Sequence, residues 1–158
     1  LRYFNVAGAD PGGRSGQTIP KATHLLKVAC EAALGKRDVI EIYGEDYATS
    51  DGTCIRDYIH VSDLAAAHVA TLDKLKKSSS NLILNCGYGH GVTVRQIIDK
   101  VSEISGVTLN VKGAARRPGD PMEIFANTQS IEGTLNWTPK YDNLDDIVST
   151  ALEWERRL

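Results

Sequence analysis

Cysteine is scarce in this sequence, and the charges nearly cancel. The 158 residues include only Cys30, Cys54 and Cys86, an odd number with no Cys-x-x-Cys pair. This pattern supports neither a zinc site nor a redox motif and favours a reduced, cytoplasmic protein. The formal net charge of -2 excludes the strongly basic field of nucleic-acid-binding proteins, so we expect no nucleic-acid partner.

Long apolar runs are also missing. No stretch reaches the roughly 20 residues of a membrane span, and no signal-peptide pattern precedes the first predicted element, so we expect no membrane partner. The sequence is otherwise of ordinary globular composition, 42% hydrophobic and 24% charged, with enough length for one domain with a real core.

Hydrophobic periodicity predicts alternating helices and strands. Strands are expected at residues 1–4, 39–43, 55–61, 81–86 and 107–111, and helices at 23–34, 64–75, 93–105, 127–135 and from 143 onward. Thr93 and Gln96 form a capping-box pattern. The glycines of Gly87–Gly91 lack the GxGxxG spacing of a dinucleotide fingerprint, so we interpret them as a tight turn. The fold class is α/β with a partly parallel sheet.

The stretch Gly44–Leu64, GEDYATSDGTCIRDYIHVSDL, holds the densest set of candidate functional residues. It opens as a polar loop and then alternates like a strand. In an extended chain Arg56, Tyr58 and His60 share one face. That face could grip an anion and stack on a ring. An edge strand with a solvated polar face is equally compatible with these residue types.

A second candidate anion site is the segment ARRPGDP, residues 115–121. The planar fork of an arginine such as Arg117 matches phosphate oxygens, and Pro-Gly makes the turn rigid. Asp120 could accept from ribose hydroxyls or hold an arginine in place. Two further candidates are Asn5, expected where the first strand ends, and His24, in the first turn of a helix capped by Thr23. A surface charge cluster is the alternative at 115–121.

Together these motifs resemble the UDP-glucose (UDP-galactose) 4-epimerases of the extended short-chain dehydrogenase/reductase family. The resemblance runs from RYFNVAGAD at the start, through DYxTxDGTxxRDYIHVxDL, to ARRPGD late in the chain. It implies a Rossmann-like α/β fold. The chain begins in mid-strand at Leu1 without Met and contains no Tyr-x-x-x-Lys pair. We therefore expect residues 1–158 to be the C-terminal, substrate-binding part, with the NAD-binding half absent.

The resemblance also implies roles for individual residues. Arg56 and Arg117 would hold the diphosphate, Asp120 the ribose and Tyr43 the uracil, while Ile124 lies where the family has a gate for N-acetylated sugars. The full set expected to bind the UDP-sugar is Asn5, His24, Leu25, Glu41, Ile42, Tyr43, Arg56, Tyr58, Val94, Arg117, Asp120 and Ile124. NAD, held mainly by the absent half, would meet Tyr3 and Phe4. We expect neither a catalytic residue nor a metal ligand here, and interpret His60 as structural.

The reaction that this resemblance implies is NAD-dependent epimerisation at C4, which interconverts UDP-galactose and UDP-glucose. The full-length protein is expected to be a cytoplasmic homodimer, and this chain alone to be inactive. Two alternatives stay open. One is another NAD-dependent nucleotide-sugar enzyme, a dehydratase or decarboxylase, and the other is a nucleotide-sugar-binding module without catalysis.

Overall fold

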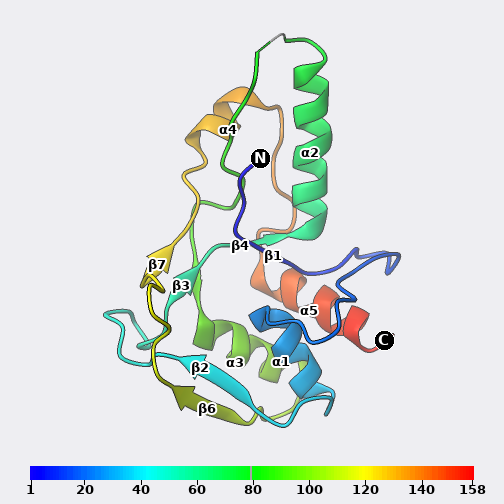
Figure 1. Ribbon diagram of the computed structural model, residues 1–158. Helices are drawn as coiled ribbons and strands as arrows, with labels where there is room; N and C mark the ends of the chain where they lie inside the picture. Colours follow the sequence, from blue (N-terminus) through cyan, green and yellow to red (C-terminus); the bar gives the residue numbers. More distant parts are fainter. Residues whose placement is uncertain (79) are drawn as a thin grey trace.

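The computed structural model describes residues 1–78 and 80–158 (Figure 1). Its helices are α1 Leu25–Ala33, α2 Val61–Leu75, α3 Val94–Ser105, α4 Gln129–Thr134 and α5 Leu144–Glu155. Its strands are β1 Asn5–Ala7, β2 Ile40–Tyr43, β3 Ile55–Arg56, β4 Tyr58–His60, β5 Val92–Thr93, β6 Val111–Ala114 and β7 Glu123–Ile124. No helix in these described ranges is long and apolar enough to cross a bilayer.

The described strands pair into three small sheets. β1 pairs with β4 and β2 pairs with β6, both in parallel. β3 lies between β5, which is antiparallel to it, and β7, which is parallel. Because parallel neighbours need crossover connections, α1 lies between β1 and β4 in the sequence, and α2 and α3 lie between β2 and β6. The predicted α/β class with parallel pairing is confirmed.

Two hydrophobic clusters hold the elements together. In the lower part of Figure 1, α1, α3 and α5 pack on one another and on β2 through buried aliphatic side chains, including Ala29, Ile40, Ile97, Val148 and Leu152. The second cluster joins α2 and α4, in the upper part of Figure 1, and includes Ile59, Leu64, Ala67, Leu84 and Ile131. The apolar stripes that predicted these helices therefore face the two clusters.

Several predicted boundaries are wrong because strand partners set them. Residues 1–4 and 81–86 do not form strands and are joined by an isolated bridge between Arg2 and Asn85. The strand expected at 107–111 is shifted to β6, since its pairing with β2 places Val111 opposite Ile40. His24, and not Thr23, occupies the N-cap of α1, and its side chain does not cap the helix.

The predicted alternation through residues 55–61 is also wrong. The run divides at Asp57 into β3 and β4, which pair in different sheets, and Asp57, Tyr58, Ile59 and His60 are all buried. A solvated polar edge is thereby excluded. His60 has partners that the sequence did not predict: its Nδ1 accepts from the Ser62 amide at 3.1 Å, and its ring stacks on Tyr141. Burial lowers the pKa of His60, which suits a neutral structural imidazole.

Asp57 and Asp63 of the stretch Gly44–Leu64 hold neighbouring loops in place. The Asp57 carboxylate accepts from the backbone amides of Tyr88 at 3.2 Å and Ala126 at 3.0 Å. A Cβ at Gly87 would lie 2.3 Å from Asp57 Oδ2, so only glycine fits there. Asp63 accepts from the Tyr88 hydroxyl at 2.8 Å. The glycine loop is thus a tightly packed turn, as predicted.

The capping box at the start of α3 is present and gives a stability prediction. Thr93 Oγ1 accepts from the Gln96 amide at 3.0 Å, and Gln96 Oε1 accepts from the Thr93 amide at 2.7 Å. Thr93→Val should lower the free energy of unfolding by about 1–2 kcal/mol, since it removes the cap and the hydrogen bond that Thr93 Oγ1 donates to Asp51 Oδ2, without loss of volume. Urea unfolding of the chain measures this change.

Thr128 supplies the matched control for this substitution. It occupies the N-cap of α4, where its side chain makes no capping hydrogen bond within the described residues. Thr128→Val should therefore leave the urea midpoint nearly unchanged. Equal midpoint shifts in the two variants would show that the Thr93 cap contributes nothing specific.

Candidate binding site

One cavity of about 1020 Å³ gathers residues from distant parts of the chain. It is lined by the segment entering β1, the start of α1, the strands β2, β3 and β4, the start of α3 and the turn after β6. Of the residues expected from the sequence, it includes Tyr3, Phe4, Asn5, His24, Leu25, Glu41, Ile42, Tyr43, Arg56, Tyr58, Val94 and Arg117. Asp120 and Ile124 lie outside this lining.

Asp120 joins the two arginines that were expected to bind an anion. Arg56 Nη2 donates to Asp120 Oδ1 at 2.5 Å, and Arg117 Nε and Nη2 donate to Oδ2 at 3.1 and 2.8 Å. Burial alone would raise the pKa of Asp120, but the hydrogen bonds from Arg117 and Arg56 hold that pKa below its ordinary value. The carboxylate therefore stays charged and fixes both guanidinium groups at one wall of the cavity.

The two arginines differ in how much they remain available. The Arg56 side chain is 12% exposed, and its Nη1 also donates to the Ile55 carbonyl at 2.6 Å. The Arg117 side chain is 59% exposed. Arg56 is thus part of the wall, whereas Arg117 still offers donors to solvent or to a ligand.

A ring lies beside Arg117 on β2. The Arg117 guanidinium is 5.0 Å from the centre of the Tyr43 ring, within the range of a cation–π contact. The Tyr43 hydroxyl donates to Glu41 Oε2 at 2.7 Å, and this bond raises the pKa of Tyr43. Ile42 is buried while Glu41 and Tyr43 are exposed, as the alternation of β2 predicts. An exposed aromatic next to a guanidinium is suited to a ligand with a ring and an anionic group.

The floor of the cavity is formed where β1 pairs with β4. Asn5 begins β1, so the prediction that it follows the end of a strand is wrong. It stands opposite Tyr58 in the parallel register. Its Nδ2 donates to the Asp57 carbonyl at 3.0 Å. Burial raises the pKa of Tyr58, so its phenol stays protonated and can donate a hydrogen bond. Tyr3 and Phe4 line the same cavity with nearly half of their surface exposed.

The remaining expected residues lie at three positions. His24 and Leu25 are at the start of α1, and Val94 is the first residue of α3; all three line the cavity. Ile124 is on β7, opposite Arg56 in the register with β3, and is partly buried.

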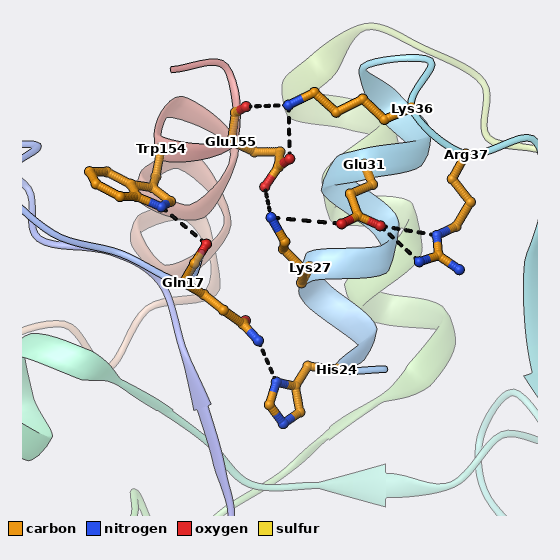
Figure 2. Close-up of polar contacts among 8 residues, drawn as sticks. All are labelled: Gln17, His24, Lys27, Glu31, Lys36, Arg37, Trp154 and Glu155. Carbon is orange, nitrogen blue, oxygen red and sulfur yellow. Dashed lines mark hydrogen bonds and ion pairs between the residues drawn. The ribbon is translucent and has the colours of Figure 1, made fainter. Parts of the chain in front are cut away.

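Sequence reasoning assigned no site role to several residues of the lining: Gln17, Lys27, Cys54, Trp154 and Glu155. Figure 2 shows four of these, on the loop before α1, on α1 and on α5. The position of Lys27 in the sequence could have marked it as unusual. It precedes Cys30 by three positions and Leu34 by seven, so a charged residue falls on the apolar stripe of its helix. Nothing in the sequence points from Lys27 to its partner on α5.

An α/β fold with two arginines fixed at the wall of a cavity is suited to an anionic ligand. Residues 1–87 match the profile of the NAD dependent epimerase/dehydratase family. The chain belongs to this NAD dependent epimerase/dehydratase family.

Individual relatives share the whole of this chain. A UDP-glucose 4-epimerase from Azospirillum brasilense is 56% identical over 158 residues, which are 100% of this chain and 45% of the relative. A crystal structure of a UDP-glucose 4-epimerase has a TM-score of 0.95 at 42% identity, over 99% of this chain and 47% of the other. The enzyme from Brucella ovis, in complex with NAD, has a TM-score of 0.92 at 43% identity, over 98% and 48%. The chain spans about half the length of the curated relatives it matches.

Proposed function

We propose that this chain is the UDP-sugar-binding part of an NAD-dependent UDP-glucose 4-epimerase, which interconverts UDP-galactose and UDP-glucose. The observation that carries the proposal is the cluster of Arg56, Asp120 and Arg117 at the wall of a cavity lined by most of the expected residues. Two guanidinium groups suit a diphosphate, because their N–H groups can donate to its oxygens in pairs. We infer that the diphosphate belongs to a UDP-sugar from the names of the relatives, which are UDP-glucose 4-epimerases.

Each part of a UDP-sugar has a counterpart in the cavity or directly beside it. Arg117 and Arg56 would hold the diphosphate, with Asp120 placed to accept from the ribose hydroxyls. Tyr43 and the backbone of β2 would hold the uracil. Asn5 and Tyr58 would position the sugar, and His24, Leu25, Val94 and Ile124 would border the ligand. Arg117 and Asp120 lie in the turn that joins β6, paired with β2, to β7, paired with β3.

NAD suits the part of the cavity next to Tyr3 and Phe4. These rings are 45% and 48% exposed and line the cavity on the side of Asn5, so they could contact a large aromatic cofactor. When bound, NAD would supply the hydride acceptor and donor for the sugar. We assign most of its binding, and the acid–base group, to a preceding half of a longer polypeptide, with residues 1–158 as its C-terminal part.

The longer polypeptide is proposed to act as a cytoplasmic homodimer. A reducing compartment is supported by Cys30, Cys54 and Cys86, which are buried and unpaired with one another. Burial raises the pKa of the Cys30 thiol to about 12 and that of Cys86 to about 11, so both remain unreactive thiols at neutral pH.

Activity tests the proposal directly. The longest natural polypeptide that carries this sequence should convert UDP-galactose to UDP-glucose when purified with NAD. UDP-glucose is measured through a coupled UDP-glucose dehydrogenase. UDP-glucuronic acid serves as the comparison substrate. Release of carbon dioxide from it, or dehydration of UDP-glucose, without any epimerisation would replace the proposal with a decarboxylase or dehydratase.

A further inference from the structure

The loop that precedes α1 is fastened to α5. Trp154 Nε1 donates to the Gln17 carbonyl at 3.2 Å. A Cβ at Gly16 would lie 2.4 Å from the Trp154 ring, so the backbone of the loop lies directly on the indole. Because α5 packs on α1 and α3 in the larger cluster, Gln17 is attached to a rigid part of the fold.

The next residue of α5 fastens α1 itself. Glu155 is 3% exposed and pairs with Lys27 of α1, which is 8% exposed, and with Lys36 after α1 at 2.9 Å. Figure 2 shows Trp154 and Glu155 reaching in opposite directions, one to the loop and one to the helix. Consecutive residues of α5 thus hold both segments that meet at His24.

The Gln17 side chain uses this fixed position to hold His24. Gln17 Nε2 lies 2.6 Å from His24 Nδ1. The amide nitrogen of glutamine can only donate, so Nδ1 accepts, and the proton of the neutral imidazole is on Nε2. Figure 2 shows the second ring nitrogen of His24 pointing away from Gln17. Both residues line the cavity, and His24 stands at the N-terminus of α1, where the helix dipole favours anions.

We infer that Gln17 is a positioning residue that keeps His24 as the Nε2–H tautomer, so that the imidazole presents one donor to an oxygen of the bound nucleotide. This inference rests on the proposed function for its ligand. It accounts for the presence of a histidine at a helix start where its side chain does not cap the helix. It also accounts for the fixing of the preceding loop, which places the Gln17 amide against Nδ1 of His24.

The tautomer can be measured without any ligand. Long-range ¹H–¹⁵N spectra of the labelled chain, at a pH of about 8.5 and thus well above the ordinary imidazole range, distinguish Nε2–H from Nδ1–H. The parent should show Nε2–H. Gln17→Glu should switch His24 to Nδ1–H, because a carboxylate can only accept. Gln129→Glu, which adds the same charge at an exposed position on α4, should leave the tautomer unchanged.

UDP titration then tests the role toward a ligand. In the longest natural polypeptide with this sequence, Gln17→Glu should weaken UDP binding at least about tenfold, the loss expected for one charge-assisted hydrogen bond, and Gln129→Glu should not. Nδ1–H in the parent overturns the inference, and this spectrum needs no variant to fold. An unchanged tautomer in a folded Gln17→Glu variant overturns it as well. A parent that fails to bind UDP overturns the proposed function instead, and the ligand-free spectra still decide whether Gln17 positions His24.

Discussion

Arg117→Ala should weaken UDP binding about 10- to 150-fold, which corresponds to about 1.5–3 kcal/mol for a lost hydrogen bond to a charged group. Of the two arginines, Arg117 can be replaced with less disturbance of the fold. Its side chain is 59% exposed, whereas the Arg56 side chain is 12% exposed and also donates to the Ile55 carbonyl. Calorimetric titration of UDP into the longest natural polypeptide measures the change, and the NAD content should stay that of the parent.

The adjacent arginine provides the control. Arg116 is held by Asp46 at 2.6 Å and lies 4.0 Å over the Tyr47 ring, outside the lining of the cavity. Arg116→Ala removes the same charge one position away and should leave UDP affinity at the parent value. Equal losses in the two variants would mean that the charge acts only through the general field. A loss in Arg116→Ala alone would contradict the diphosphate assignment.

Glu155→Gln should lower the free energy of unfolding by about 3–5 kcal/mol, because it leaves a buried lysine without its partner. Lys27 would then face only Glu31, whose Oε1 is 3.7 Å away. Urea unfolding of the chain, followed by tryptophan fluorescence, measures the loss. Adding Lys27→Met should recover part of it, since the unpaired charge is removed with the lysine.

Glu153→Gln is the matched control on the same helix. Glu153 is 56% exposed and lies 3.4 Å from Arg156 and 3.5 Å from Arg157. Loss of such surface pairs should cost less than about 1 kcal/mol. Equal midpoints for the Glu153 and Glu155 variants would refute the idea that the pair with Lys27 stabilises the fold.

The same pair makes a contribution that depends on pH. Burial would raise the pKa of Glu155, but hydrogen bonds from Lys27 and Lys36 hold it below the ordinary value of 4.5. A depressed carboxyl pKa stabilises the fold above the ordinary value, and this contribution is lost as the pH falls through the pKa of the folded state. The free energy of unfolding should therefore fall less on acidification in Glu155→Gln than in the parent. The variant has no proton to take up at that position.

Local chemistry was readable from the sequence. Thr93 and Gln96 form their capping box, because this pattern depends on residues within three positions. The membership of the cavity was also largely predicted, since the motifs around Arg56 and Arg117 carry the resemblance.

Contacts between distant segments were not readable. β6 begins at Val111 because β2 pairs there, and the run after Ile55 divides because its two halves find different partner strands. Lys27 and Glu155 are 128 residues apart, and neither residue carries a local sign of the other. A single sequence contains periodicity but no register, so strand boundaries and buried charge pairs follow only from the assembled fold.

The carboxylate shared by two arginines also determines how salt should act on this site. Arg56, Asp120 and Arg117 together carry one net positive charge, not two, because Asp120 remains ionised between them. An anion that approaches within the Debye length of about 8–10 Å, but has not yet made contact, responds to that net charge. Raising the ionic strength should therefore slow the arrival of a nucleotide less than it would at a pair of uncompensated arginines. The hydrogen bonds between the arginines and the nucleotide contribute only after the nucleotide has made contact.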